Sequence, residues 1–214
     1  MFGELVSFID ALRSAVGELR SRKLTTQRET IISALLSTYF YLKDATDEGE
    51  VLLEDAKPNP VKVIKSLDPD EAKERLARWN IVLGRQTFRL MRVSDLIYGQ
   101  VFIDVVSPEL REQLYEVLGS KHDRASSLHS IGASLYFRGW VDRSLEEQAR
   151  YVSVMAGEET NLLHMKKIRA EIATLREVME EYRLAIIQLS TSDEIVRLSA
   201  NARMETKLPN EGLA

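Results

Sequence analysis

Few residues of this chain have side chains suited to catalysis, and the most suggestive pair lies close together in the sequence. His129 follows Arg124 after a gap of four residues. A histidine can transfer protons near neutral pH, and an arginine can stabilise the negative charge that builds up on a phosphate ester during cleavage. The two residue types together are therefore suited to cutting a phosphodiester.

The segment Arg124-Ala-Ser-Ser-Leu-His129 resembles the Arg-x4–6-His motif of HEPN-domain ribonucleases, which are also small helical bundles. The resemblance implies metal-independent cleavage of RNA, with Arg124 and His129 completing a site at a dimer interface. Ala125 stands where that family often has a polar residue. The alternative for this pair is an arginine on a helix surface beside a partly buried histidine.

Other catalytic and cofactor sites are not indicated by the sequence. The chain has no cysteine, which excludes thiolate nucleophiles and cysteine-ligated zinc, and it has only 3 histidines. Walker A, GxGxxG and GxSxG motifs are missing, as are HExxH and Glu-x-x-His pairs. His122 precedes His129 by seven positions without a further ligand, and His164 is expected to be structural. We therefore expect no cofactor.

An acidic stretch runs over residues 44–55 and loosely resembles a calcium-binding EF-hand loop. It has an acid at its first position and Gly49 at its sixth, but Thr46 and Asp55 are poor matches to the required ligands. An acidic loop at the end of a helix is the better interpretation, and the alternative is that the stretch extends that helix. We expect no metal site.

A row of arginines, called here the arginine stripe, follows on a predicted helix. It consists of Arg75, Arg78, Arg85, Arg89 and Arg92. At 100° per residue these five positions fall within about 100° of arc. No acidic residue occurs between Arg75 and Ser94, and we expect no aromatic residue on this face. Such a row can bind phosphate or the carboxylates of a partner.

The acidic stretch offers a second explanation for the arginine stripe. Its acids are Asp44, Asp47, Glu48, Glu50, Glu54 and Asp55, with no basic residue among them. They could neutralise the stripe within the chain or across an oligomer, and the stripe could also be simply solvated. A protein partner and a nucleic acid are the two alternatives in which the stripe has a function.

Helical periodicity covers most of the chain, and no alternating strand pattern is present. Thr26 and Glu29 predict a capping box, Asp68-Pro69 predicts a sharp helix start, and Ser192 predicts a cap. Helices are expected at residues 2–19, 26–42, 61–67, 69–105, 107–118, 121–137, 144–157 and 165–189, and after Ser192. Gln86 lies among apolar residues of the fourth of these helices, where it could fix register or oligomeric state, or could lie at a solvated rim.

These patterns predict an all-α protein, an up-and-down bundle of four to five long antiparallel helices with additional short helices. We expect one domain at residues 1–206 and a polar tail at 207–214, with no membrane span and a cytoplasmic location. The favoured function is a non-catalytic interaction module, such as an adaptor, an accessory subunit or an immunity-type protein. It would bind a protein partner, and it could also form homo-oligomers. The alternatives are a HEPN-like ribonuclease and a nucleic-acid-binding protein.

Overall fold

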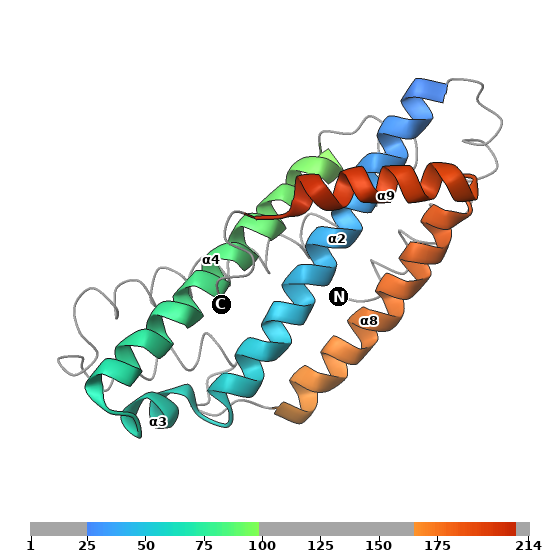
Figure 1. The fold of residues 1–214 in the computed structure, drawn as a ribbon. Coiled ribbons are helices and arrows are strands. Elements are labelled where there is room, and N and C mark those ends of the chain that lie inside the picture. Colours follow the sequence, from blue (N-terminus) through green and yellow to red (C-terminus); the bar gives the residue numbers. More distant parts are fainter. Residues whose placement is uncertain (1–24, 99–164, 209–214) are drawn as a thin grey trace. The chain divides into compact units, whose positions relative to one another are not determined.

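A computed structural model of the chain describes residues 25–98 and 165–208 (Figure 1). Every regular element in these residues is an α-helix, which confirms the all-α prediction for this part of the chain. The helices are α2 (Thr25–Ala56), α3 (Pro60–Lys65), α4 (Pro69–Tyr98), α8 (Met165–Ile187) and α9 (Ser192–Thr206). None of them has the length and apolar character needed to cross a membrane. The predicted helices at residues 2–19 and 107–157 lie outside the described residues.

The starts of α3 and α4 are set by their capping residues. Asp68 Oδ1 accepts hydrogen bonds from the backbone N–H groups of Asp70 and Glu71, at 3.0 and 2.9 Å. Pro69 occupies the first helical position, where its missing N–H costs nothing. Asn59 caps α3 in the same way, by accepting a hydrogen bond from Lys62 N at 3.1 Å. The predicted start at Asp68-Pro69 is confirmed.

The acidic stretch is helical throughout, because α2 continues without a break to Ala56. The interpretation of this stretch as a loop is therefore wrong, and with it the resemblance to a calcium-binding loop. Two prolines in the segment 57–60 end the helix, as expected from their inability to occupy a helix interior. The predicted capping box at Thr26 is also wrong, because Thr26 is helical and Glu29 pairs with Arg197 of α9.

The turn between α8 and α9 differs by one residue from the prediction. Thr191, and not Ser192, is the N-cap of α9. The reason is the position of Glu194, which is the third helical residue when Thr191 is the cap and can then complete a reciprocal capping box.

The described residues belong to two compact units. Unit 1 contains residues 25–44, 89–98 and 173–208, and unit 2 contains residues 45–88 and 165–172. The prediction of a single domain at residues 1–206 stays a prediction.

Unit 1 has an apolar core to which α2, α4, α8 and α9 all contribute. The most deeply buried members are Ile32, Leu35, Val93, Tyr182, Ala185, Ile186, Leu189 and Ala202. The Tyr182 hydroxyl donates a hydrogen bond to the Leu35 carbonyl oxygen at 3.2 Å, so α8 is joined to α2 by a polar contact inside the core. Burial raises the pKa of Tyr182, which keeps this hydroxyl in its neutral, donating form.

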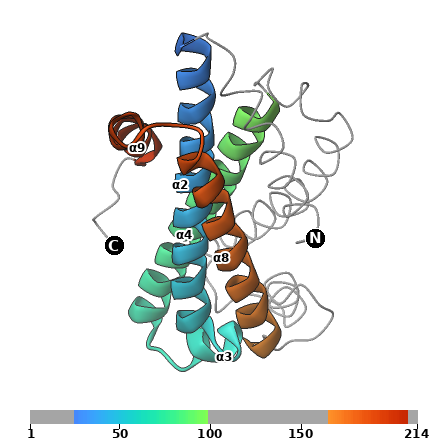
Figure 2. The ribbon, with the colours of Figure 1, turned by 90° about the vertical axis from the view of Figure 1, so that its right-hand side faces the viewer.

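α9 lies across α2 in unit 1 (Figures 1 and 2). Leu198 and Ala202 point into the core and are 5 % and 0 % exposed. Arg203 makes an ion pair with Asp44 of α2, and its guanidinium carbon lies 5.4 Å from the centre of the Phe40 ring. Apolar burial and polar contacts therefore both hold α9 against α2.

Unit 2 has a separate core built from α2, α3 and α4 around Trp79. Its buried residues are Leu52, Ala56, Ile64, Ala72, Leu76, Trp79 and Leu83. Leu76, Trp79 and Leu83 are spaced at three and four positions, so one side of α4 faces this core. The apolar side of α4 that the sequence predicts is confirmed in these residues.

A pair of contacts at Asp55 fixes α2 against α4 in unit 2. Asp55 Oδ2 accepts a hydrogen bond from Trp79 Nε1 at 2.7 Å, and Asp55 Oδ1 pairs with Arg75. Further along, Gln86 Nε2 donates to the Ala45 carbonyl oxygen at 3.2 Å. As residue numbers rise in α2 they fall in α4, so the two helices are antiparallel here.

Replacing Asp55 with alanine should lower the free energy of unfolding by roughly 2 kcal/mol, because the buried indole N–H of Trp79 then has no acceptor. Asp55→Asn should cost less, since an amide oxygen can still accept that hydrogen bond. Urea unfolding followed by circular dichroism measures both. Glu74→Ala, which removes an exposed acid on α4, is the control and should change stability little. An equal effect of the alanine and asparagine variants would contradict this role for the indole hydrogen bond.

Candidate interaction surface

Three members of the arginine stripe, Arg75, Arg78 and Arg85, belong to unit 2. Arg75 pairs with Asp55, and Arg85 Nη1 lies 3.5 Å from Glu48 Oε1. Both acids come from the acidic stretch, so part of the stripe is neutralised within the chain. Arg78 is exposed, and it makes no ion pair with a residue in the ranges 25–98 and 165–208.

The other two members of the arginine stripe, Arg89 and Arg92, belong to unit 1. Arg89 is 1 % exposed, so the accessible part of the stripe does not include it. Arg92 is exposed, with Nη1 3.6 Å from Asp95 Oδ2 one helical turn further on. The five arginines that the sequence places on one face thus have three different environments: paired, buried and exposed.

Two large apolar side chains lie on the same side of α4 as Arg78. Ile81 is 54 % exposed and Phe88 is 39 % exposed. At 100° per residue, Arg78, Ile81 and Phe88 fall within about 80° of arc. We call these three residues the α4 surface. Phe88 lies about 40° outside the arc of the arginine stripe, next to it. The spacing of seven residues between Ile81 and Phe88 is the signal in the sequence that places these two side chains on one side of the helix.

The acidic stretch has two sides in unit 2. Glu48 and Asp55 turn toward α4, where they meet Arg85 and Arg75. Val51, on another side of α2, is 70 % exposed. Glu54 shares that side and pairs with both Arg169 and Lys57. The hydrogen bond from Arg169 is the main cause of a pKa of Glu54 below its usual value.

Gln86 lies between α2 and α4 inside unit 2. Its side chain donates to the Ala45 carbonyl oxygen and lies over Gly49, where an added Cβ would be 2.8 Å from Gln86 Nε2. The amide is therefore used in a contact within the chain. The position is one at which a polar side chain selects one register of a helix pair, as the sequence allowed.

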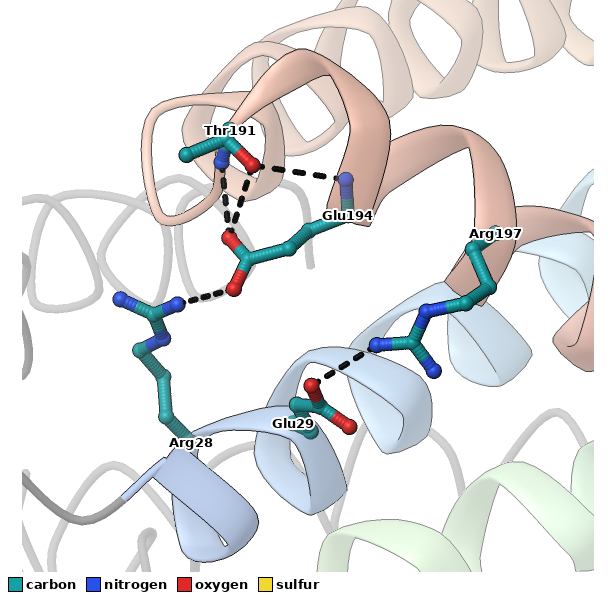
Figure 3. A network of polar contacts seen from close by, with 5 residues as sticks. All are labelled: Arg28, Glu29, Thr191, Glu194 and Arg197. Atoms are coloured by element: carbon teal, nitrogen blue, oxygen red, sulfur yellow. Dashed lines mark hydrogen bonds and ion pairs between the residues drawn. The ribbon is translucent and has the colours of Figure 1, made fainter.

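A network of polar contacts joins the start of α9 to the start of α2 in unit 1 (Figure 3). Thr191 N and Thr191 Oγ1 donate to Glu194 Oε2, at 3.0 and 3.1 Å. The other carboxylate oxygen of Glu194 pairs with Arg28, and Arg197 Nη2 donates to Glu29 Oε1 at 2.7 Å. Glu194 thus completes the capping box of its own helix and also attaches that helix to α2.

The remaining candidates from the sequence, Arg124 and His129, lie outside the described residues, as do His122 and His164. The ribonuclease prediction therefore stays a prediction. Within the described ranges, no three His, Cys, Asp or Glu residues are arranged to hold a metal ion.

Comparisons with protein-family profiles, with curated proteins and with solved structures give no match for this chain.

The contact between Gly49 and Gln86 leads to a prediction about coupling. Gly49→Ala gains about 1 kcal/mol of helix propensity but displaces the Gln86 amide, which loses a hydrogen bond worth about 1 kcal/mol. In a Gln86→Ala background, the same change should stabilise the protein by about 1 kcal/mol, since nothing is then displaced. Urea unfolding of the four proteins of this double-mutant cycle measures the coupling. Equal effects of Gly49→Ala in both backgrounds would show that the two residues do not interact.

The network at Glu194 predicts a loss of stability in acid. Hydrogen bonds from Thr191, together with the charge of Arg28, hold the pKa of Glu194 below its usual value of 4.5. Because the folded-state pKa is lowered, this stabilisation is complete above the unfolded-state pKa and is lost as the pH falls through the folded-state value. At neutral pH the wild type should have a higher melting temperature than the Glu194→Gln variant. This difference should become smaller below about pH 4.5.

The matched control is Glu205→Gln, which alters an exposed acid of α9. Its melting temperature should follow the wild type at every pH. A difference between wild type and Glu194→Gln that stays constant down to acid pH would contradict the role given to the Glu194 charge.

Proposed function

We propose that this chain is a non-catalytic helical interaction module that binds a protein partner through the α4 surface in unit 2. An adaptor, an accessory subunit and an immunity-type protein are all modules of this kind. The proposal includes the predicted architecture of four to five long antiparallel helices. It also includes the predicted cytoplasmic location.

The observation that carries the proposal is the exposure of Ile81 at 54 %, on a helix whose opposite side is already buried in a core. Phe88 and the exposed Arg78 lie on the same side. Phenylalanine and arginine are enriched at protein interfaces, and a large exposed aliphatic side chain next to them gains free energy when a partner covers it. The surface therefore has the composition of a small binding patch, and it has no acidic residue to oppose a carboxylate from a partner.

The architecture is supported by helix length. α2, α4 and α8 contain 32, 30 and 23 residues, well above the average helix of roughly 11–12 residues. In unit 2, α2 and α4 are antiparallel neighbours connected through α3. Long antiparallel helices with short connections are typical of up-and-down bundles.

The test is an affinity capture from cells that express the chain naturally, with bound proteins identified by mass spectrometry. Ile81→Glu should remove a specific partner, because it puts a charge at the centre of the α4 surface. Arg78→Glu should weaken capture, because it reverses the charge offered to the partner. Circular dichroism checks that both variants stay folded, as expected for exposed positions.

The matched control is Val196→Glu, which puts the same charge on an exposed apolar position of α9. We expect the partner to bind wild type and this control equally, to bind Arg78→Glu more weakly and not to bind Ile81→Glu. Equal capture by all four proteins, or recovery of nucleic acid alone, would contradict it. If only nucleic acid is recovered, an RNA-cleavage assay of wild type and His129→Ala would distinguish a HEPN-like ribonuclease from a nucleic-acid-binding protein.

A further inference from the structure

We propose that the partner of the α4 surface is a second copy of this chain, which docks through the side of α2 that carries Asp47, Val51 and Glu54. The inference rests on the proposed function, because it names the occupant of the same surface. Both docking sides belong to unit 2, so the contact is formed by one unit from each copy.

The docking side of α2 has an exposed apolar residue between two acids. Val51 is 70 % exposed. Among the large apolar side chains of the described residues, only Val196 of α9 is equally exposed. Asp47 precedes Val51 by four positions and Glu54 follows it by three. At 100° per residue these three positions fall within about 60° of arc. An apolar centre with an acid on each side therefore runs along this part of α2.

The α4 surface, together with the neighbouring Arg85, has the opposite charge with the same spacing. Arg78 precedes Ile81 by three positions, and Arg85 follows Ile81 by four. Each side thus spans seven residues, or about 10.5 Å of helix. If the two helices run antiparallel, Val51 comes opposite Ile81, Glu54 comes opposite Arg78, and Asp47 comes opposite Arg85. Spacings of three and four residues are those that keep a helix pair in contact over successive turns.

Charge makes the pairing selective. There is no basic residue between Asp44 and Asp55 and no acidic residue between Arg75 and Ser94. Two α4 surfaces would repel one another, as would two acidic sides of α2, so only the mixed contact is favourable. Arg85 is partly covered by Glu48, which leaves the pair of Glu54 with Arg78 as the main electrostatic contact. The pairs of Glu54 with Lys57 and Arg169 are solvent-exposed and cost little to exchange.

The test is a charge exchange followed by analytical ultracentrifugation of the full-length chain. Wild type should form dimers or larger assemblies at high concentration. Arg78→Glu and Glu54→Lys should each weaken self-association by roughly tenfold or more, because each brings like charges together. An equimolar mixture of the two variants should associate again, because the glutamate introduced on α4 of one copy then meets the lysine introduced on α2 of the other.

A second pair of variants tests the apolar centre. Val51→Glu and Ile81→Glu should each abolish self-association, and Val196→Glu, which alters an exposed residue of unit 1, should not. A monomeric wild type would overturn the inference, and so would an assembly that survives both central variants or a mixture that fails to recover. If the wild type is monomeric but affinity capture yields a different protein that depends on Ile81, the proposed function stands and only the second copy is excluded as its partner.

Discussion

The carboxylate of Asp55 is the contact on which the arrangement of unit 2 depends. It binds the indole N–H of Trp79, at the centre of the core, and the guanidinium of Arg75 at the edge of that core. A buried indole N–H needs an acceptor, and a carboxylate near a core needs a counter-charge. Asp55 satisfies both needs at once, and in doing so it sets the register of α2 against α4.

That register decides which charges remain available. With Asp55 against Arg75, one side of α2 faces α4, and Glu48 comes within reach of Arg85. The side of α2 that carries Val51 and Glu54 then faces away from this contact. On α4 the same register leaves Arg78 exposed beside Ile81. The two surfaces to which we assign binding are therefore consequences of how the inner charges are paired.

The local features of the fold were predictable because they depend on neighbouring residues. Asp68 followed by Pro69 specifies a helix start by itself, and the spacing of apolar residues along α8 predicts that helix to within two residues of its observed end at Ile187. The environment of each arginine was not predictable, because it depends on which acid of a distant helix lies opposite. The burial of Arg89 and the pairing of Arg85 are set by helix packing. A helix face calculated from 100° per residue contains no information about which neighbouring helix covers it.

Two errors have the same physical origin. The acidic stretch suggested a loop because its acids and Gly49 loosely match a calcium-binding loop, but it is helical, and its Glu48 and Asp55 pair with arginines of α4. Similarly, Ser192 suggested a cap by its type, whereas the cap is decided by the reach of Glu194 back to Thr191. In both cases a contact between side chains selected one of the local alternatives that the sequence allowed.

The different accessibilities of the arginines can be measured directly by labelling the folded chain with phenylglyoxal, which modifies accessible guanidinium groups. Peptide mass spectrometry then locates the labels. We predict that Arg78 is modified before Arg75 and Arg85, because acids of α2 cover those two arginines, and that Arg89 is modified only when the chain unfolds. Modification of Arg89 as fast as Arg78, or of all three unit 2 arginines at one rate, would contradict this prediction.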